Sequence, residues 1–211
     1  MRKIINPQVE NYLYALLPRR DAVPREMERY AAEHSVPIVG PACGRFLYQM
    51  ARLVRARRIF ELGSAIGYST LWLARAVGDA GVVYYTDSDE RNAERAKAYL
   101  RRAGVESRVR FLVGEALSSL GRAPGKFDLI FNDVSKTQYP TVFRRALPRL
   151  RQGGLFITDN VLWSGKVTRK SEAKDVETRA IQTFNRLIYS SRQLWTTIVP
   201  LRDGMAVSLK L

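Results

Sequence analysis

Acidic side chains follow several short β-rich stretches of this sequence, each at the point where the stretch ends. They are Glu61, Asp87, Glu115, Asp133 and Asp159, with Asn160 next to the last. Helix capping explains some of these positions, but Ser or Thr can cap a helix as well. The carboxyl ends of parallel strands meet at one edge of a sheet, so these oxygens are expected to gather there. Such a group suits the binding of hydroxyl groups and of a hard cation.

A turn with two glycines follows the first of these stretches. The apolar run at residues 58–62 ends around Glu61, Gly63 and Gly67 mark the turn, and apolar residues then recur at helical spacing. The pattern predicts a strand, a tight turn and a helix, which is half of a nucleotide-binding βαβ unit. The helix N-terminus behind Ser69 offers N–H groups to a carboxylate or phosphate. The Gly-x-x-x-Gly spacing fits the dinucleotide fingerprint poorly and lacks the Gly-Lys-Ser/Thr of a phosphate loop.

Asp87 ends the second predicted strand, residues 82–87. In α/β nucleotide sites an acid at this point binds the ribose hydroxyls. An Asp here can equally cap the next helix, which the pattern predicts over residues 89–103. We favour the ribose role because the preceding strand carries the glycine turn.

The rest of the pattern alternates short strands with helices. A strand and its exit are predicted at residues 109–116, and further strands at 127–133 and 154–158. Helical patterns separate them, which indicates a mostly parallel α/β sheet with crossovers on both faces. Residues 192–199 and 205–211 alternate apolar and polar side chains and predict a β-hairpin at one edge.

Helical segments also frame this core. One or two helices are expected in residues 7–34, followed by a break at 36–44 and a helix over 45–54 with Phe46, Leu47, Met50 and Leu53 inward. The return helix is expected over residues 172–189. We expect a single domain, residues 1–211, with a helical cap at 1–55 and an α/β core at 56–211.

Composition narrows the class of protein. The chain has 211 residues, of which 46% are hydrophobic, and no segment resembles a signal peptide or a membrane span. A cytoplasmic protein without a membrane partner is therefore expected. The single cysteine, Cys43, cannot form an internal disulfide and is expected to be a packing residue. His34, the single histidine, is expected at the surface, at a helix end.

The net charge of +15 predicts attraction to polyanions, and to nucleic acid first. However, 27 of the 35 basic residues are arginines scattered along the whole chain. A composition bias toward arginine produces the same distribution without a selected patch. The charge therefore leaves a nucleic-acid footprint and a solvated basic surface both open.

Taken together, the motifs resemble the class I S-adenosylmethionine-dependent O-methyltransferases of the catechol and caffeoyl-CoA type. The matching stretches run from about residue 36 to the end of the chain and include residues 61–69, 114–117, 127–139, 158–161 and 203–204. The resemblance implies a Rossmann-like sheet of seven strands, mostly parallel, with helices on both faces and an antiparallel C-terminal strand.

The resemblance also assigns a methyl-donor site. Glu61, Gly63 and Ser69 are expected to hold the amino-acid end of S-adenosylmethionine, and Asp87 its ribose. Glu115 and Ala116 are expected at the adenine. The full set of cofactor-binding candidates is Val39, Glu61, Gly63, Ser64, Gly67, Tyr68, Ser69, Asp87, Ser88, Glu115, Ala116 and Asp133.

A metal site and a base complete the implied machinery. Asp133, Asp159 and Asn160 match the metal ligands of the family, and their hard oxygens suit Mg²⁺, with Ca²⁺ or Mn²⁺ as alternatives. The resemblance places Lys136 as the general base that takes the proton of the acceptor hydroxyl. Taken without the family, Lys136 reads as an exposed lysine on a loop.

Three functions remain open at this point. The first is methylation of a small phenolic, catechol-like acceptor, although Ala206 replaces the acid that follows Asp-Gly in the catechol enzyme. The second is methylation of wobble 5-hydroxyuridine in tRNA, because residues 31–38 and 11–13 resemble that bacterial branch. The third is a non-catalytic nucleic-acid-binding protein with this fold. The resemblance also implies a homodimer.

If tRNA is the substrate, basic residues near the predicted active-site loops are expected to contact its phosphates. They are Arg144, Arg145, Arg149, Arg151, Lys166, Arg169 and Lys170.

Overall fold

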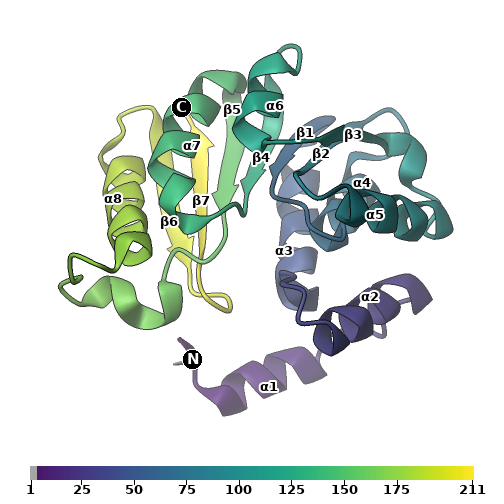
Figure 1. Cartoon of the computed structure of the whole chain (residues 1–211), viewed down its shortest axis with the longest axis horizontal. Helices are drawn as coiled ribbons and strands as arrows, with labels where there is room; N and C mark the ends of the chain where they lie inside the picture. Colours follow the sequence, from purple (N-terminus) through teal and green to yellow (C-terminus); the bar gives the residue numbers. More distant parts are fainter. Residues whose placement is uncertain (1–3) are drawn as a thin grey trace. The chain divides into compact units, whose positions relative to one another are not determined.

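The computed structural model describes residues 4–211, and seven strands are found in this range (Figure 1). They are β1 (Arg58–Leu62), β2 (Val82–Asp87), β3 (Val109–Val113), β4 (Phe127–Asn132), β5 (Leu150–Thr158), β6 (Leu194–Val199) and β7 (Met205–Lys210). Their order in the sheet is β3-β2-β1-β4-β5-β7-β6. The neighbouring pairs β1–β2, β2–β3 and β4–β5 are parallel, and β7 is antiparallel to both β5 and β6. The predicted mostly parallel α/β sheet with an antiparallel C-terminal strand is confirmed.

The chain divides into two units, which we describe separately. One runs from Leu16 to Ala123, and the other holds Pro124–Leu211 together with the N-terminal segment up to Ala15. The expected single domain, with a cap at 1–55 and a core at 56–211, stays a prediction. Its first three residues lie outside the described range.

The unit Leu16–Ala123 contains the glycine turn. Around β1, β2 and β3 lie five helices of its described residues: α2 (Ala22–Glu33), α3 (Gly40–Leu53), α4 (Tyr68–Val77), α5 (Glu90–Arg102) and α6 (Ala116–Arg122), with a short 3-10 turn, η1 (Glu106–Arg108). Nine of the ten residues of α4 are buried, so this helix forms the centre of the unit. Cys43 is buried on α3, as expected of a packing residue. His34 is exposed at the C-terminal end of α2 and stacks on Tyr30, as predicted.

The first helix after the expected break differs from the sequence prediction. It begins at Gly40 and not near residue 45, so the break at 36–44 is only half as long as expected. Pro41 does not interrupt it, because proline is tolerated in the first turn, where its missing N–H has no helical partner. At the other end, Leu53 was expected inward but is 67% exposed.

In the second unit the strands β4, β5, β7 and β6 carry α7 (Tyr139–Ala146) and α8 (Val176–Ser190), with 3-10 turns η2 (Lys136–Gln138), η3 (Leu147–Arg149) and η4 (Trp163–Thr168). Phe156 of β5 packs against Phe143 of α7 and Phe184 of α8, which places these helices on the same face. The C-terminal hairpin is confirmed. The return helix begins at Val176, four residues later than expected, and β5 begins at Leu150, four residues earlier.

The N-terminal helical region proves to be two helices, α1 (Pro7–Ala15) and α2. No residue of α1 is buried, and its apolar side chains Val9, Tyr12 and Leu13 are exposed. None of the helices in the described residues is long and apolar enough to cross a membrane.

Gly204, in the turn between β6 and β7, allows one of the tightest contacts in this unit. Its φ is +85°, and a Cβ added there would lie 2.4 Å from Cγ of Leu162. We expect Gly204→Ala to lower the free energy of unfolding by about 2–4 kcal/mol, through left-handed strain and overpacking together. Urea denaturation measures this.

Gly121 is the matched control for that substitution. It lies in α6, and a Cβ there would meet no atom within 4 Å. Gly121→Ala is therefore expected to leave stability unchanged or to raise it slightly, because alanine favours the helix. Equal stabilities of the two variants would contradict the packing argument.

Candidate active site

Glu61 joins the glycine turn to the helix that follows it. Its side chain is fully buried, and Oε2 accepts hydrogen bonds from Oγ of Ser64, at 2.7 Å, and from Oγ1 of Thr70 on α4. The backbone N–H of Thr86 donates to Oγ of Ser64 at 3.1 Å, which adds β2 to the same network. The carboxylate therefore fixes the turn between β1 and α4 from both ends.

Gly67 provides the left-handed conformation at the start of α4. Its φ is +82°, and a Cβ there would lie 2.8 Å from Cβ of Ala96 on α5. Its N–H donates to the carbonyl of Ser64 at 2.8 Å, closing the turn. The first N–H groups of α4 thus begin directly behind the turn, where a helix attracts anionic groups.

Asp87 supports the opposite side of the turn. Its Oδ2 accepts the N–H of Ala65 at 2.9 Å, and Oδ1 accepts the N–H of Asp89 at 2.8 Å. The N-cap of α5 is Asp89, which accepts the N–H of Arg91 at 2.9 Å. The alternative in which Asp87 caps this helix is therefore wrong, and a carboxylate has acceptor sites left for ribose hydroxyls.

The third strand end lies next to Asp87. The N–H of Gly114 donates to the backbone carbonyl of Asp87 at 2.8 Å, and Glu115 and Ala116 follow Gly114 in the chain. Glu115 itself caps α6, with Oε1 accepting the N–H of Leu117 at 3.0 Å. The structure therefore gives Glu115 a capping role, whereas its expected role at the adenine stays a prediction.

The remaining cofactor candidates of this unit differ in exposure. Ser64, Tyr68, Ser69 and Val39 are buried, Gly63 is partly exposed, and Ser88 is exposed. Tyr68 and Ser69 form the first turn of α4, and Val39 precedes α3. Their contact with a cofactor stays a prediction.

The predicted metal ligands lie in the second unit and come together at two neighbouring strand ends. Asp133 follows β4, and Asp159 and Asn160 follow β5, with Asn132 and Thr158 paired in register. The N–H of Asp159 donates to the carbonyl of Asn132 at 3.1 Å. Asn160 has a φ of +57°, a left-handed conformation that asparagine adopts more readily than most residues.

Burial makes the charge of these two carboxylates unfavourable. It raises the pKa of Asp159 to about 7, and the charge of Asp133 adds to the effect. Burial also raises the pKa of Asp133, against the opposing charge of Lys136. A divalent cation would remove this repulsion, so two carboxylates and an amide with hard oxygens fit Mg²⁺. The described residues contain no group of three or more His, Cys, Asp and Glu side chains that could hold a metal, and the predicted set has only two carboxylates.

Lys136 is not an exposed loop lysine. Its side chain is 13% exposed, and Nζ donates to Oδ1 of Asp133 at 2.9 Å and to the carbonyl of Val134 at 3.4 Å. The ammonium also lies 5.3 Å from the ring centre of Tyr139 and 6.0 Å from that of Trp163. The interpretation of Lys136 as an exposed loop lysine is therefore wrong, whereas its role as general base stays a prediction.

The structure shows that the loop at residues 162–165 is held by Asp203, a contact that the sequence did not predict. Trp163, Ser164 and Gly165 follow Asn160 closely and all have positive φ values. Asp203 holds this loop: its Oδ1 accepts the N–H of Ser164, and its carbonyl accepts the N–H of Leu162 at 2.9 Å. The Asp-Gly pair had been noted as a family motif, but the residue it contacts lies 39 positions away.

Comparison with known proteins assigns the family. Residues 21–211 match the protein family described as O-methyltransferase. The chain belongs to this family. Together with the relatives given below, this match confirms the resemblance to the catechol and caffeoyl-CoA type of O-methyltransferase and the prediction of an S-adenosylmethionine-dependent O-methyltransferase.

Individual relatives agree with this family assignment. The O-methyltransferase is 32% identical over 220 residues to a catechol O-methyltransferase of Niastella koreensis, covering 99% of each chain. It is 28% identical to a caffeoyl-CoA O-methyltransferase of Stellaria longipes, covering 94% of this chain and 88% of the relative. The crystal structure of an O-methyltransferase from Bacillus cereus in complex with SAH is similar, with a TM-score of 0.88, 30% identity and 97% of both chains covered.

Proposed function

We propose that the enzyme transfers the methyl group of S-adenosylmethionine to the hydroxyl of a small phenolic acceptor, with a divalent cation held by Asp133, Asp159 and Asn160. The observation that carries the proposal is the pairing of two carboxylates at neighbouring strand ends, Asp159 buried and Asp133 half-buried, with the ammonium of Lys136 at 2.9 Å from Asp133. This arrangement brings oxygen ligands and an amine together at the loop that follows β4. The relatives named for catechol and caffeoyl-CoA support a phenolic acceptor.

The glycine turn and its surroundings supply the methyl-donor site in this proposal. The N–H groups at the start of α4 are suited to the carboxylate of S-adenosylmethionine, and Asp87 to its ribose hydroxyls. Glu61 provides negative charge for the ammonium, and its position is fixed by Ser64 and Thr70. The SAH bound to the Bacillus cereus relative supports this choice of cofactor.

The chemistry requires one proton transfer and one substitution. The hydroxyl of the acceptor loses its proton to Nζ of Lys136, which must be neutral to accept it. The oxygen then forms a bond to the methyl carbon as the bond from that carbon to the sulfonium sulfur breaks. Asp133, Asp159 and Asn160 would hold a divalent cation, and its charge would favour the ionised form of the acceptor hydroxyl.

The decisive test is a transfer assay with S-adenosylmethionine and a panel of phenols, including caffeoyl esters and catechols. Methyl ethers should form with at least one acceptor, and removal of divalent cations with EDTA should stop their formation. Formation of the same ether at full rate in EDTA would overturn the metal assignment.

Cation binding itself has a separate readout. We expect Mg²⁺ at about 100 times its dissociation constant to raise the melting temperature by about 5–10 °C, because a ligand that binds only the folded state stabilises it by about 2.7 kcal/mol. Asp159→Asn should abolish this shift. Asp128→Asn, which removes the partner of Arg151 in the same unit, should retain it. A loss of the shift in both variants would contradict the assigned ligands.

A second acceptor is favoured by the net charge of +15. If the substrate is 5-hydroxyuridine in tRNA, exposed cations would contact phosphates. Of the candidate residues, Arg144, Arg145, Lys166, Arg169 and Lys170 are exposed. Arg149 instead donates to the carbonyl of Gly125, at 2.8 Å from Nη2, and Arg151 pairs with Asp128.

Mass spectrometry of tRNA nucleosides from cells that lack the protein decides between these acceptors. Accumulation of 5-hydroxyuridine in place of its methoxy form would identify tRNA as the substrate, and unchanged nucleosides would favour a phenol. Binding of tRNA by the purified protein without transfer to any acceptor would instead support the non-catalytic function. The homodimer and the cytoplasmic location stay predictions.

A further inference from the structure

Tyr68, the first residue of α4, forms a hydrogen bond that leaves its own helix. Its side chain is only 1% exposed, and its hydroxyl donates to Oε1 of Glu28 on α2 at 2.6 Å. Burial and the neighbouring Glu28 both raise the pKa of Tyr68, so the phenol keeps its proton and remains the donor. A hydroxyl that donates to a carboxylate is among the stronger hydrogen bonds in proteins.

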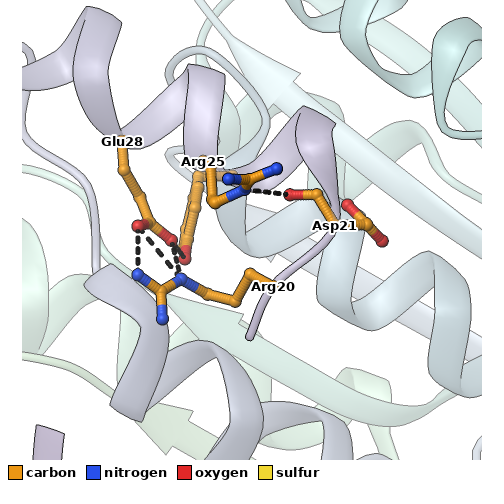
Figure 2. Close-up of polar contacts among 5 residues, drawn as sticks. Arg20, Asp21, Arg25 and Glu28 are labelled. Atoms are coloured by element: carbon orange, nitrogen blue, oxygen red, sulfur yellow. Dashed lines mark hydrogen bonds and ion pairs between the residues drawn. The ribbon is translucent and has the colours of Figure 1, made fainter. Parts of the chain in front are cut away.

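Glu28 is itself held by a second residue, Arg20. Nε of Arg20 donates to Oε1 of Glu28 at 2.8 Å, and Nη2 donates to Oε2 at 2.9 Å. Figure 2 shows this two-point contact, with Arg20 coming from the segment that precedes α2. The side chains are 26% and 20% exposed, so the pair is partly shielded from solvent. The carboxylate that receives Tyr68 therefore has a fixed position.

The first turn of α4 is thus tied to carboxylates on two elements. Thr70 donates to Glu61 on β1, and Tyr68 donates to Glu28 on α2. The residue between them is Ser69, and Gly67 stands directly before them in a left-handed conformation. Any shift of this turn would move the N–H groups proposed above to receive the methyl donor.

The contact with Tyr68 is not required to attach α2 to its unit. Arg75 of α4 pairs with Asp21 at 2.6 Å, and Arg102 of α5 pairs with Glu26 of α2. The guanidinium of Arg95 lies 4.1 Å from the ring centre of Tyr30. These contacts reach the last turn of α4 and two residues of α5, whereas Glu28 reaches the first turn of α4, which adjoins the glycine turn.

We propose that Glu28, oriented by Arg20, is a positioning residue for the methyl-donor site. It acts through Tyr68, by fixing the first turn of α4 in the geometry that receives the carboxylate of S-adenosylmethionine. The inference rests on the proposed function of the glycine turn as the cofactor site. It predicts that loss of Glu28 weakens cofactor binding without impairing the transfer step.

The test measures S-adenosylhomocysteine binding by titration calorimetry. Glu28→Ala and Tyr68→Phe should each raise the dissociation constant about tenfold, and the double variant should raise it no further, because one hydrogen bond is removed in all three. Glu28→Gln retains a carbonyl that accepts from Tyr68 and should give a smaller increase. In steady-state assays, KM for S-adenosylmethionine should rise by the same factor, with kcat unchanged.

Glu26→Gln is the matched control. It lies on the same helix, two residues away, and also removes an arginine partner, but that partner is Arg102 on α5. Its dissociation constant for S-adenosylhomocysteine should equal that of the wild type. If Glu28→Ala fails to fold, Tyr68→Phe carries the test, because it deletes a single oxygen.

An unchanged dissociation constant in Tyr68→Phe would overturn the inference, as would additive losses in the double variant. A lower melting temperature without weaker binding would show a purely structural role and would overturn it as well. Failure of the wild type to bind S-adenosylhomocysteine is a distinct result, which would overturn the cofactor assignment and the inference together.

Discussion

Asp159→Ala is expected to lower the rate of methyl transfer by about three orders of magnitude in the presence of Mg²⁺. The reason is that a bound cation supplies several kcal/mol of stabilisation to the developing oxyanion, and each 1.36 kcal/mol changes the rate tenfold. Asp159 is buried and is followed directly by Asn160, so its loss removes one proposed ligand and the neighbour of another. Rates measured with S-adenosylmethionine and the preferred phenol check this expectation.

The substitution should leave the fold intact, because it removes a buried carboxylate whose pKa is raised to about 7 mainly by burial. Asp128→Asn serves as the control, since Asp128 lies in the same unit and pairs with Arg151. A rate for Asp159→Ala within tenfold of the control would show that transfer does not need this cation.

Lys136→Ala is expected to lower kcat by about 10³, within the range that general acid–base catalysis contributes. Its ammonium lies 2.9 Å from Asp133 and its side chain is 13% exposed, so no other amine of the described loop residues 133–138 can replace it. Lys136→Arg distinguishes a role of Lys136 as proton acceptor from a role as a positive charge. Arginine keeps the positive charge but does not release its proton, so this variant should be as slow as Lys136→Ala.

Lys174→Ala is the control for the lysine series, because the side chain of Lys174 is 87% exposed and pairs with Glu172, which is itself 72% exposed. Its kcat should match the wild type. Recovery of activity in Lys136→Arg would mean that charge, and not proton transfer, is the role of Lys136. If the rate of methyl transfer to every tested acceptor is unchanged in both Lys136→Ala and Asp159→Ala, the proposed mechanism is wrong.

Local sequence patterns were sufficient to predict much of the sheet. The second strand, Val82–Asp87, has the predicted bounds, and the hairpin around residues 200–204 pairs as expected. Both depend on alternation and on turn residues, which act over a few positions. The same holds for the acids at strand ends, because parallel strands bring successive carboxyl ends to one edge. Asp133 and Asp159 meet for this reason, which required only the order of β4 and β5.

Helix ends and side-chain partners could not be predicted from local sequence patterns alone. The sequence could not tell whether Asp87 binds ribose or caps α5, because an aspartate suits both roles; in the structure Asp89 is the cap and Asp87 accepts the N–H of Ala65. Pro41 lies within the break expected from the sequence, although its position in the first turn of α3 makes it compatible with the helix. Leu53 fits the periodic pattern of that helix but faces solvent, since exposure depends on what packs against the helix.

The tertiary structure alone decided the contacts between residues far apart in the chain. Asp203 holds the loop at Ser164, and Glu28 receives the hydroxyl of Tyr68. No periodicity or spacing encodes such pairs, because the residues between them do not constrain the distance between their ends. The sequence by itself therefore determined which side chains stand at the strand ends. Packing decided which of them are buried, which are tied to other elements, and how Lys136 comes to lie against Asp133.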